Sequence, residues 1–316
     1  MAGTIRDDAG RPRRVLTTSL AEVGAHRIGI VIALTSVLAL GSACASEPAA
    51  DTAAVATVTA TPTAFATPSQ SSTPTASLTR TPTPTPTTKA VRKPSLVGNK
   101  HNAWAFAPLS DPSKITVEGS VPSSKAYSTS KVPIIAAFIA TVGQGDPTRL
   151  SSRQRGWIEK ALATSDGAAM SQIQNAIPGG PATAVTKIFR AIGDKTTTGR
   201  NTLTGTMQWS VREQVRFMAA LNGGKVVNEK TSAYILARMH PVKSQSWGLG
   251  TVGATAFKGG WYSSSRETRQ MGIVDGYAVA IITDGTIGPV ILQSDGDSAH
   301  VAQLNKLAAR LHQRLR

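Results

Sequence analysis

The sequence predicts an α+β fold, in which strands from both ends of one domain form an antiparallel sheet around an inserted block of helices. Two short strand patterns, at residues 104–108 and 114–118, precede a long stretch of helical periodicity. Period-2 apolar runs return only after that stretch, and Asp-Gly turn signals separate them. Strands on both sides of a helical block favour this fold class over alternating βαβ units.

The elements follow one another along the chain in a simple order. The helical patterns cover residues 132–142, 151–164, 167–176, 182–192, 210–222 and 229–239. Pro-Gly-Gly-Pro at 178–181 and Gly-Gly at 223–224 interrupt them, because neither residue type favours a helix interior. Later strands are predicted at residues 254–258, 269–274, 278–283 and 290–293. A final helix is predicted over residues 298–315.

Residues 1–45 have the features of an export signal or a membrane anchor. An apolar stretch at 28–40 follows Arg13, Arg14 and Arg27, and small residues occupy 41–45. Positive charge stays on the cytoplasmic side, so the rest of the chain is expected outside the cytoplasm, secreted or membrane-anchored. Cys44 is a candidate lipidation site. Cleavage after Ala45 and retention as an uncleaved anchor are the open alternatives.

The next segment, residues 46–95, consists mostly of Ala, Thr, Ser and Pro, with a Thr-Pro repeat near its end. Such a composition cannot bury a core, so we expect a disordered, semi-rigid spacer. The folded domain is predicted over residues 96–316. A length of about 220 residues is enough for a substantial hydrophobic core.

Charge and composition limit the partners and cofactors. The formal net charge is +16, which favours an anionic partner such as acidic cell-envelope material or anionic lipid. Aromatic residues make up 5% of the chain and no basic stripe is interleaved with them, so nucleic acid is not expected. The single cysteine excludes an intrachain disulfide. The five histidines are not closely paired, so neither a metal nor another cofactor is predicted.

The most informative motif is Ser128-Thr-Ser-Lys131, which opens an apolar helical run. Residues three apart share one helix face, so the hydroxyl and the amine are expected side by side. A serine needs a base to become a nucleophile at neutral pH, and a lysine can be that base if burial lowers its pKa. At a helix start, the backbone N–H of Ser128 can also stabilise an oxyanion.

This motif, placed at the start of the helical block, resembles the serine β-lactamase and penicillin-binding protein superfamily, and its class A β-lactamase-like branch in particular. The superfamily carries three motifs, S-x-x-K, S-D-N and K-T-G. The resemblance implies a β-lactamase-like or transpeptidase-like fold. It also implies a serine hydrolase that acts on a cell-wall peptide or related amide in a bacterial envelope, with peptidoglycan as a partner.

The second and third motifs are degenerate. Ser165-Asp166-Gly167 has glycine where the superfamily has asparagine, and Lys258-Gly259-Gly260 has glycine where it has a hydroxyl residue. The resemblance implies that Ser128, Lys131, Ser165 and Lys258 are catalytic, with Ser165 relaying protons and Lys258 orienting an anionic substrate. It also implies that substrate contacts come from four residues: Tyr127, Asp166, Gly259 and Gly260.

Class A β-lactamases use a loop glutamate to hydrolyse the acyl-enzyme, but residues 172–211 contain only one acidic residue, Asp194. We therefore expect slow deacylation and do not expect an efficient β-lactamase. Two hypotheses remain open: an exported, membrane-tethered acyl-transfer enzyme, and a catalytically impaired module that binds cell wall or a protein partner.

Overall fold

A computed structural model describes residues 92–261, 267–285 and 299–316. The predicted export signal, Cys44, almost all of the spacer and the predicted strand at 290–293 lie outside these residues, so they stay predictions. Within the described ranges, no helix is both long and apolar enough to cross a bilayer.

The described strands form one antiparallel sheet in the order β2-β1-β5-β4-β3. The strands are β1 (Asn102–Pro108), β2 (Thr116–Gly119), β3 (Ala256–Trp261), β4 (Thr268–Val274) and β5 (Tyr277–Thr283). β1 and β2 precede the helical block, whereas β3, β4 and β5 follow it, and β1 pairs with β5 along its whole length. The predicted α+β class, with a sheet formed from both ends of the domain, is therefore confirmed.

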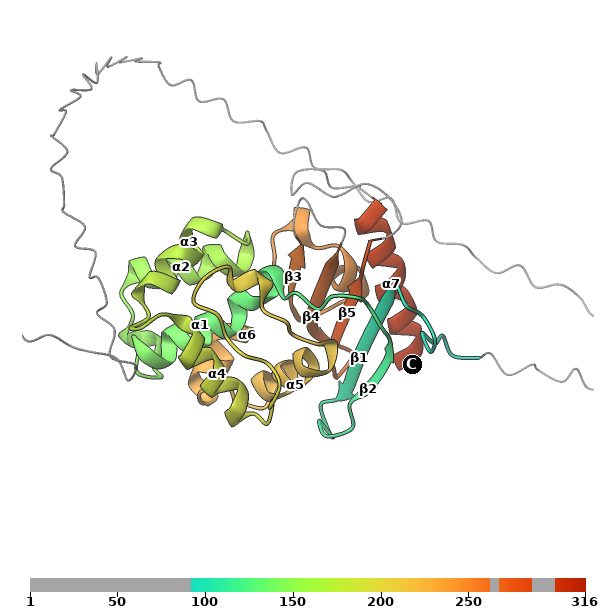
Figure 1. The fold of residues 1–316 in the computed structure, drawn as a ribbon, viewed down its shortest axis with the longest axis horizontal. Coiled ribbons are helices and arrows are strands. Elements are labelled where there is room, and N and C mark those ends of the chain that lie inside the picture. Colours follow the sequence, from blue (N-terminus) through green and yellow to red (C-terminus); the bar gives the residue numbers. More distant parts are fainter. Residues whose placement is uncertain (1–91, 262–266, 286–298) are drawn as a thin grey trace, which may run out of the picture. The chain divides into compact units, whose positions relative to one another are not determined.

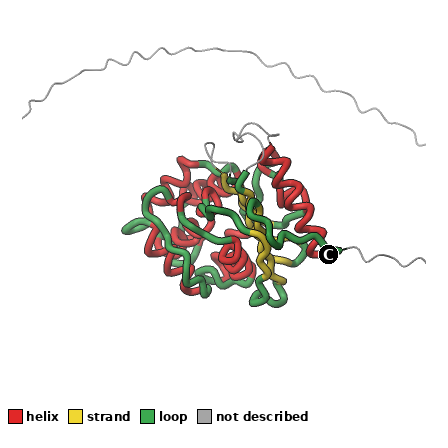
Figure 2. The backbone as a smooth tube through the Cα atoms, turned by 45° about the vertical axis from the view of Figure 1, so that its right-hand side comes forward, coloured by secondary structure: helices red, strands yellow, loops and turns green. Residues whose placement is uncertain are grey.

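Helices cover both faces of this sheet (Figures 1 and 2). The helices are α1 (Lys131–Thr141), α2 (Ser152–Ala163), α3 (Gly167–Ala176), α4 (Pro181–Ala191), α5 (Val211–Asn222), α6 (Glu229–Leu236) and α7 (Ala299–Leu315). α7 lies on one face of the sheet, and the inserted helices gather on the other side. Alternation along β5 serves both layers: Ala278 and Ala280 pack toward the inserted helices, and Val279 and Ile281 belong to the core under α7.

Helix α1 is the centre of the inserted block. All of its residues from Lys131 to Ile139 are buried, because its sequence is apolar on every side after the first lysine. A one-turn 3-10 helix, Tyr127–Ser130 (η1), leads directly into it. Ser128 therefore lies in the turn before α1, and Lys131 is the first residue of α1.

Two predicted boundaries are wrong. α6 ends at Leu236 rather than at 239, where His240-Pro241 follows and the Met239 carbonyl instead accepts a hydrogen bond from the Phe257 N–H. β3 continues past 258 to Trp261, because Gly259 and Gly260 still pair with β4. The glycines therefore extend the edge strand.

The two ends of the described domain meet at Glu118, a β2 residue that is 7% exposed. Its carboxylate accepts hydrogen bonds from the Leu96 N–H at 2.9 Å and the Ser95 hydroxyl at 2.8 Å. It also accepts from both Nε and Nη2 of Arg314 in α7, each at 3.1 Å. Burial raises the pKa of Glu118, but these hydrogen bonds outweigh it and leave the pKa below its usual value.

We predict that Glu118→Ala lowers the free energy of unfolding by about 2–4 kcal/mol, because it leaves Arg314 and a buried N–H without their acceptor. Urea denaturation measures this change. Asp111→Ala is the control, because Asp111 forms an exposed ion pair with Lys114 and its loss should barely alter stability. Equal stability of the Glu118→Ala variant and the parent would contradict the role given to this carboxylate.

Candidate active site

The turn that carries Ser128 has a strained backbone held by local hydrogen bonds. Tyr127 has φ +45°, in the left-handed region that non-glycine residues rarely adopt. The Ser130 hydroxyl donates to the Tyr127 carbonyl at 2.7 Å, and the Ala126 N–H donates to the Met207 carbonyl at 2.8 Å. These contacts fix the position of Ser128 before α1 begins.

Lys131 contacts two hydroxyl groups at once. Its Nζ lies 3.2 Å from Ser128 Oγ and 3.2 Å from Ser165 Oγ, and it also donates to the Ser165 carbonyl. Ser165 lies between α2 and α3 with φ +59°, so it too has a strained backbone at the site. The side-by-side placement expected from the i, i+3 spacing is present.

Lys258 reaches the same serine from β3. Its Nζ donates to Ser165 Oγ at 2.9 Å and to the Gly259 carbonyl at 3.0 Å. The side chain is 1% exposed. The structure thus brings together all four residues that the sequence marked as catalytic, from three separate parts of the chain, with Ser165 between the two amines.

Burial lowers the pKa values of both lysines in this cluster. Burial lowers the pKa of Lys131 to about 8, although the Asp166 carboxylate acts to raise it. Burial lowers the pKa of Lys258 well below its usual value, and the charge of Lys131 lowers it further. Lys258 is the more deeply buried of the two amines, with 1% of its surface exposed against 9% for Lys131.

Ser128 opens onto a cavity of about 180 Å³. The residues that line it are Tyr127, Ser128, Ser130, Lys131, Met170, Thr204, Gly205 and Trp261. They come from η1, the start of α1, α3, the loop between α4 and α5, and the end of β3. Ser165, Lys258 and Asp166 are not among the lining residues, and Ser165 reaches the cavity only through its hydrogen bond with Lys131.

Solved structures match this fold, whereas no family model and no curated protein matches the sequence. A variant of PBP-A in an acyl-enzyme complex with penicillin G has a TM-score of 0.51 and 19% identity, over 69% of this chain and 91% of that one. A variant of the TLA-1 extended-spectrum β-lactamase has a TM-score of 0.53 and 14% identity, over 69% and 95%. A β-lactamase from Xanthomonas campestris has a TM-score of 0.50 and 12% identity, over 68% and 92%.

The chain has the fold of the serine β-lactamase and penicillin-binding protein superfamily. The resemblance read from the three motifs is confirmed at this level. The superfamily contains serine acyl-transfer hydrolases, which agrees with a serine and two amines in one cluster. The identities are low, so they do not assign a specific activity or substrate to this chain.

The strand edge of this superfamily fold supplies a residue that the sequence analysis missed, Trp261. The Phe257 N–H points away from β4, to the Met239 carbonyl. Backbone directions alternate along a strand, so the Trp261 N–H also faces the open edge. A Cβ on Gly260 would lie 3.0 Å from the Ser128 nitrogen. Gly260 thus brings the open edge of β3, with the Trp261 N–H, up to the turn that carries Ser128.

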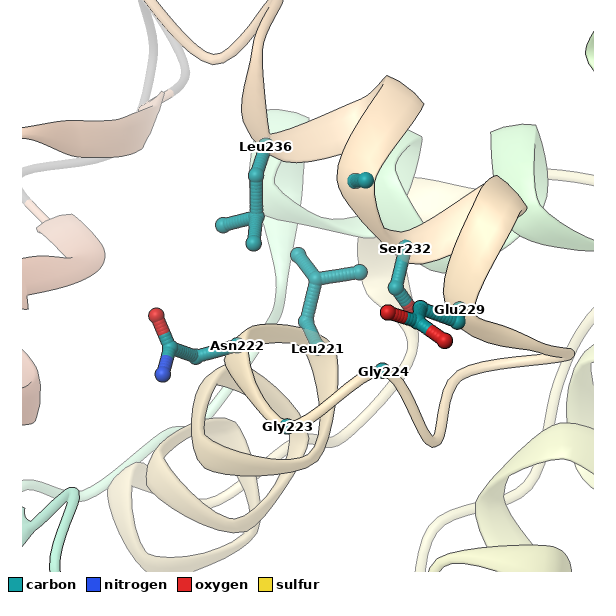
Figure 3. Close-up of a pocket in the computed structure, with 8 residues that line it drawn as sticks. Leu221, Asn222, Gly223, Gly224, Glu229, Ser232 and Leu236 are labelled. Atoms are coloured by element: carbon teal, nitrogen blue, oxygen red, sulfur yellow. The ribbon is translucent and has the colours of Figure 1, made fainter.

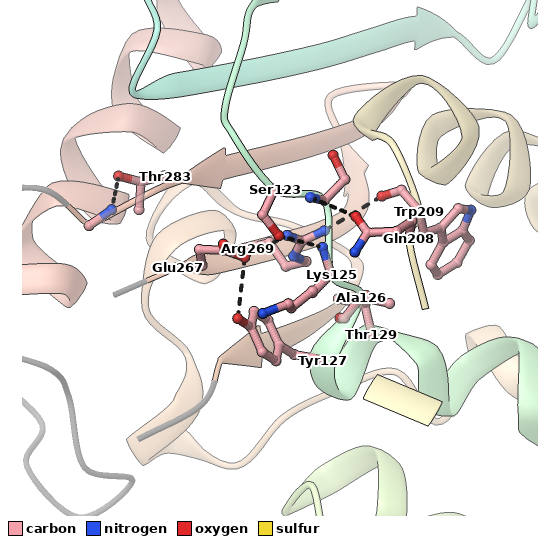
Figure 4. Close-up of polar contacts among 12 residues, drawn as sticks. Ser123, Lys125, Ala126, Tyr127, Thr129, Gln208, Trp209, Glu267, Arg269 and Thr283 are labelled. Atoms are coloured by element: carbon pink, nitrogen blue, oxygen red, sulfur yellow. Dashed lines mark hydrogen bonds and ion pairs between the residues drawn. The ribbon is translucent and has the colours of Figure 1, made fainter. Parts of the chain in front are cut away.

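Tyr127 has a supporting role in this geometry (Figure 4). Its hydroxyl donates to Glu267 at 3.2 Å, and the Arg269 guanidinium lies 5.6 Å from the centre of its ring. Arg269 is 1% exposed and lies 3.6 Å from the Glu267 carboxylate. Burial lowers the pKa of Arg269 to about 10, although Glu267 and Tyr127 act to raise it. Glu267 and Arg269, which are distant from Tyr127 in sequence but contact it in space, hold this strained residue in place.

In the second motif, Asp166 caps a helix, and Gly167 stands where the superfamily has asparagine. One Asp166 carboxylate oxygen accepts from the Ala169 N–H at 2.7 Å and caps α3, so Asp166 acts on Lys131 through its charge. A Cβ on Gly167 would meet nothing within 4 Å. The fold therefore leaves room for the missing asparagine, and any contact of Asp166 with substrate remains a prediction.

The loop between α4 and α5 brings no carboxylate to the cavity. Thr204 and Gly205 form its lining there. Asp194, the acidic residue of this region, is buried, and its carboxylate accepts from the backbone of Thr196 and Thr197 at 2.9 Å each. Asp194 thus organises its own loop. Among the described residues, no group of three or more His, Cys, Asp or Glu could hold a metal.

A larger cavity, of about 430 Å³, lies between α5 and α6 (Figure 3). Leu221 and Leu236 face it, together with Glu229 and the Gly223-Gly224 turn. None of the residues in the motif cluster lines it. The smaller cavity is the one lined by Ser128 and Lys131, so its side chains and not its size mark it as the candidate site.

We predict that Gly260→Ala reduces reactivity of Ser128 and destabilises the domain by about 1–3 kcal/mol. The new Cβ would lie 2.8 Å from the Ala126 carbonyl oxygen and 3.0 Å from the nitrogens of Ser128 and Thr129, all of them backbone atoms. Gly156→Ala in α2 is the control, because its Cβ meets nothing within 4 Å and alanine favours a helix. Thermal unfolding and serine labelling would show the difference, and a harmless Gly260→Ala would contradict the close approach.

Proposed function

We propose that the domain is a serine acyl-transfer enzyme in which Ser128 is the nucleophile. The observation that carries the proposal is the position of the Lys131 amine, within hydrogen-bond distance of both Ser128 Oγ and Ser165 Oγ. Neutral Lys131 takes the proton of Ser128 as the new O–C bond forms. Ser165 passes a proton to the leaving group as its bond to the carbonyl carbon breaks.

The developing oxyanion is stabilised by the N–H groups of Ser128 and Trp261. The proposed acyl donor is a cell-wall peptide or a related amide, which the motif resemblance and the basic charge of the chain support. In this proposal the N-terminal segment exports the domain and tethers it to the membrane of a bacterial envelope, through Cys44 or as an anchor. Mass spectrometry of the mature N-terminus tests the tether.

The acyl-enzyme is proposed to be long-lived. Hydrolysis needs a base that directs water onto the ester, and the described lining of the cavity contains no carboxylate. Thr204, which occupies the loop side, accepts a hydrogen bond from Gln174 at 2.9 Å. The domain is therefore proposed to act as a peptidase-like or transferase-like enzyme and not as an efficient β-lactamase.

The alternative function is a binding module that keeps the fold without turnover. Gly167 and Gly259 favour it, because both replace residues that the superfamily motifs supply at the site. In that case the domain binds wall material or a protein partner, and binding survives Ser128→Ala. Sedimentation of the protein with isolated peptidoglycan, together with serine labelling of the same preparation, distinguishes the binding module from the acyl-transfer enzyme.

We predict that a fluorophosphonate labels the native protein at Ser128. Ser128→Ala should abolish labelling, and Lys131→Met should slow it by about 100-fold or more, since the general base is lost. Ser171→Ala is the control, because its exposed hydroxyl only donates to the Gly167 carbonyl within α3. Intact-protein mass spectrometry measures the adduct. An unlabelled native protein, beside a control hydrolase that labels, would leave the binding module as the better account.

The pH dependence of labelling tests the base directly. Only neutral Lys131 can accept a proton, and burial lowers its pKa to about 8. The labelling rate should therefore rise about tenfold per pH unit below pH 8 and level off above it. A rate that keeps rising to about pH 10 would indicate an ordinary exposed lysine. A rate that is independent of pH between about 6 and 8 would remove Lys131 as the base.

A further inference from the structure

The position of Lys258 makes it a poor partner for a negatively charged substrate. The side chain is 1% exposed and does not line the cavity. Its Nζ donates to Ser165 Oγ at 2.9 Å and to the Gly259 carbonyl at 3.0 Å. Burial and the neighbouring Lys131 keep its pKa well below the usual value. Lys258 can therefore brace Ser165, but its side chain does not reach the lining of the cavity.

Gly259 also lacks the side-chain hydroxyl that the superfamily motif places on the edge strand. Aromatic rings approach the place where a side chain would begin. A Cβ on Gly259 would lie 3.4 Å from the ring of Trp261 and 3.7 Å from the ring of Trp247. These two indoles pack edge to face, with ring centres 5.2 Å apart. Of the two, Trp261 also lines the cavity, where it adds aromatic surface.

Of the other described cations near the cavity, Lys131 is hydrogen-bonded and Arg269 is buried away from the lining. The Lys131 amine has three donors, and it contacts Ser128 Oγ, Ser165 Oγ and the Ser165 carbonyl. Arg269 is covered by the Tyr127 ring and lies 3.6 Å from the Glu267 carboxylate. A substrate carboxylate placed against Trp261 would lose its water without gaining an ion pair from these groups.

We propose that this site selects acyl donors that carry no charge next to the scissile bond, and that Trp261 packs against an apolar or aromatic group there. The proposal rests on the proposed acyl-transfer function and names its substrate class. Met170 also lines the cavity and adds apolar surface there. For an ester donor, Ser128 Oγ forms the new bond to the carbonyl carbon and the bond to the leaving oxygen breaks. The proton moves from Ser128 through Lys131 and Ser165 to that oxygen.

The test compares two phenylacetylglycyl aryl esters that differ in the leaving group. One leaving group is 3-hydroxybenzoate, which carries a carboxylate, and the other is methyl 3-hydroxybenzoate, which is uncharged. The second-order rate of Ser128 acylation is measured on the full chain by intact-protein mass spectrometry. We expect the uncharged ester to react at least about tenfold faster. Gly259→Thr should reduce this ratio by restoring a hydroxyl, whereas Gly259→Ala, which adds a Cβ without a hydroxyl, should not.

A fluorophosphonate, applied to each variant, separates the two proposals. If it labels Ser128 while the charged ester reacts as fast as the uncharged one, the charge preference is wrong and the acyl-transfer function stands. If it labels Ser128 and neither ester reacts, the proposed substrate class is also wrong. If the fluorophosphonate does not label Ser128, the acyl-transfer function fails, and the substrate class fails with it.

Discussion

The site depends on one constraint, the burial of two amines around a single serine hydroxyl. Ser165 Oγ lies 3.2 Å from the Nζ of Lys131 and 2.9 Å from the Nζ of Lys258. Two like charges so close and so little hydrated cannot both persist, so at least one amine gives up its proton. A neutral amine in contact with a hydroxyl is the condition that an acyl-transfer serine requires. The arrangement of the fold therefore favours a neutral amine beside a serine hydroxyl, as the proposed acyl transfer requires.

Within the described residues, packing and close backbone approach hold this cluster in place. α1 is buried along most of its length, which fixes Lys131 at its first residue. β3 reaches the cluster only because Gly260 lets its backbone approach the turn that contains Ser128. The contacts of Glu118 with Leu96 and Arg314 connect β2 to the start of the described domain and to α7. A change at any of these places is expected to move the amines before it unfolds the domain.

Local patterns predicted much of this. The i, i+3 spacing placed Ser128 beside Lys131, and the alternation of apolar residues identified β4 and β5. The contacts of Tyr127 with Glu267 and Arg269 could not be predicted, because they join residues about 140 positions apart and leave no periodic signal. Trp261 was missed for a related reason: it contributes through its backbone N–H and its ring, and only the register of β3 shows where they lie. The deeper burial of Lys258 compared with Lys131 could not be predicted either, because it depends on how distant segments of the chain pack together.

The most direct measurement is an NMR titration of the lysine side-chain nitrogens in the ¹⁵N-labelled protein, with Lys258→Met and Lys131→Met used to assign the two signals. We predict that the Lys258 nitrogen loses its proton well below the pH at which an ordinary lysine does, and that Lys131 titrates near pH 8. If both nitrogens stay protonated up to about pH 10, the value of an ordinary lysine, the two amines are not buried against one hydroxyl, and the account is wrong.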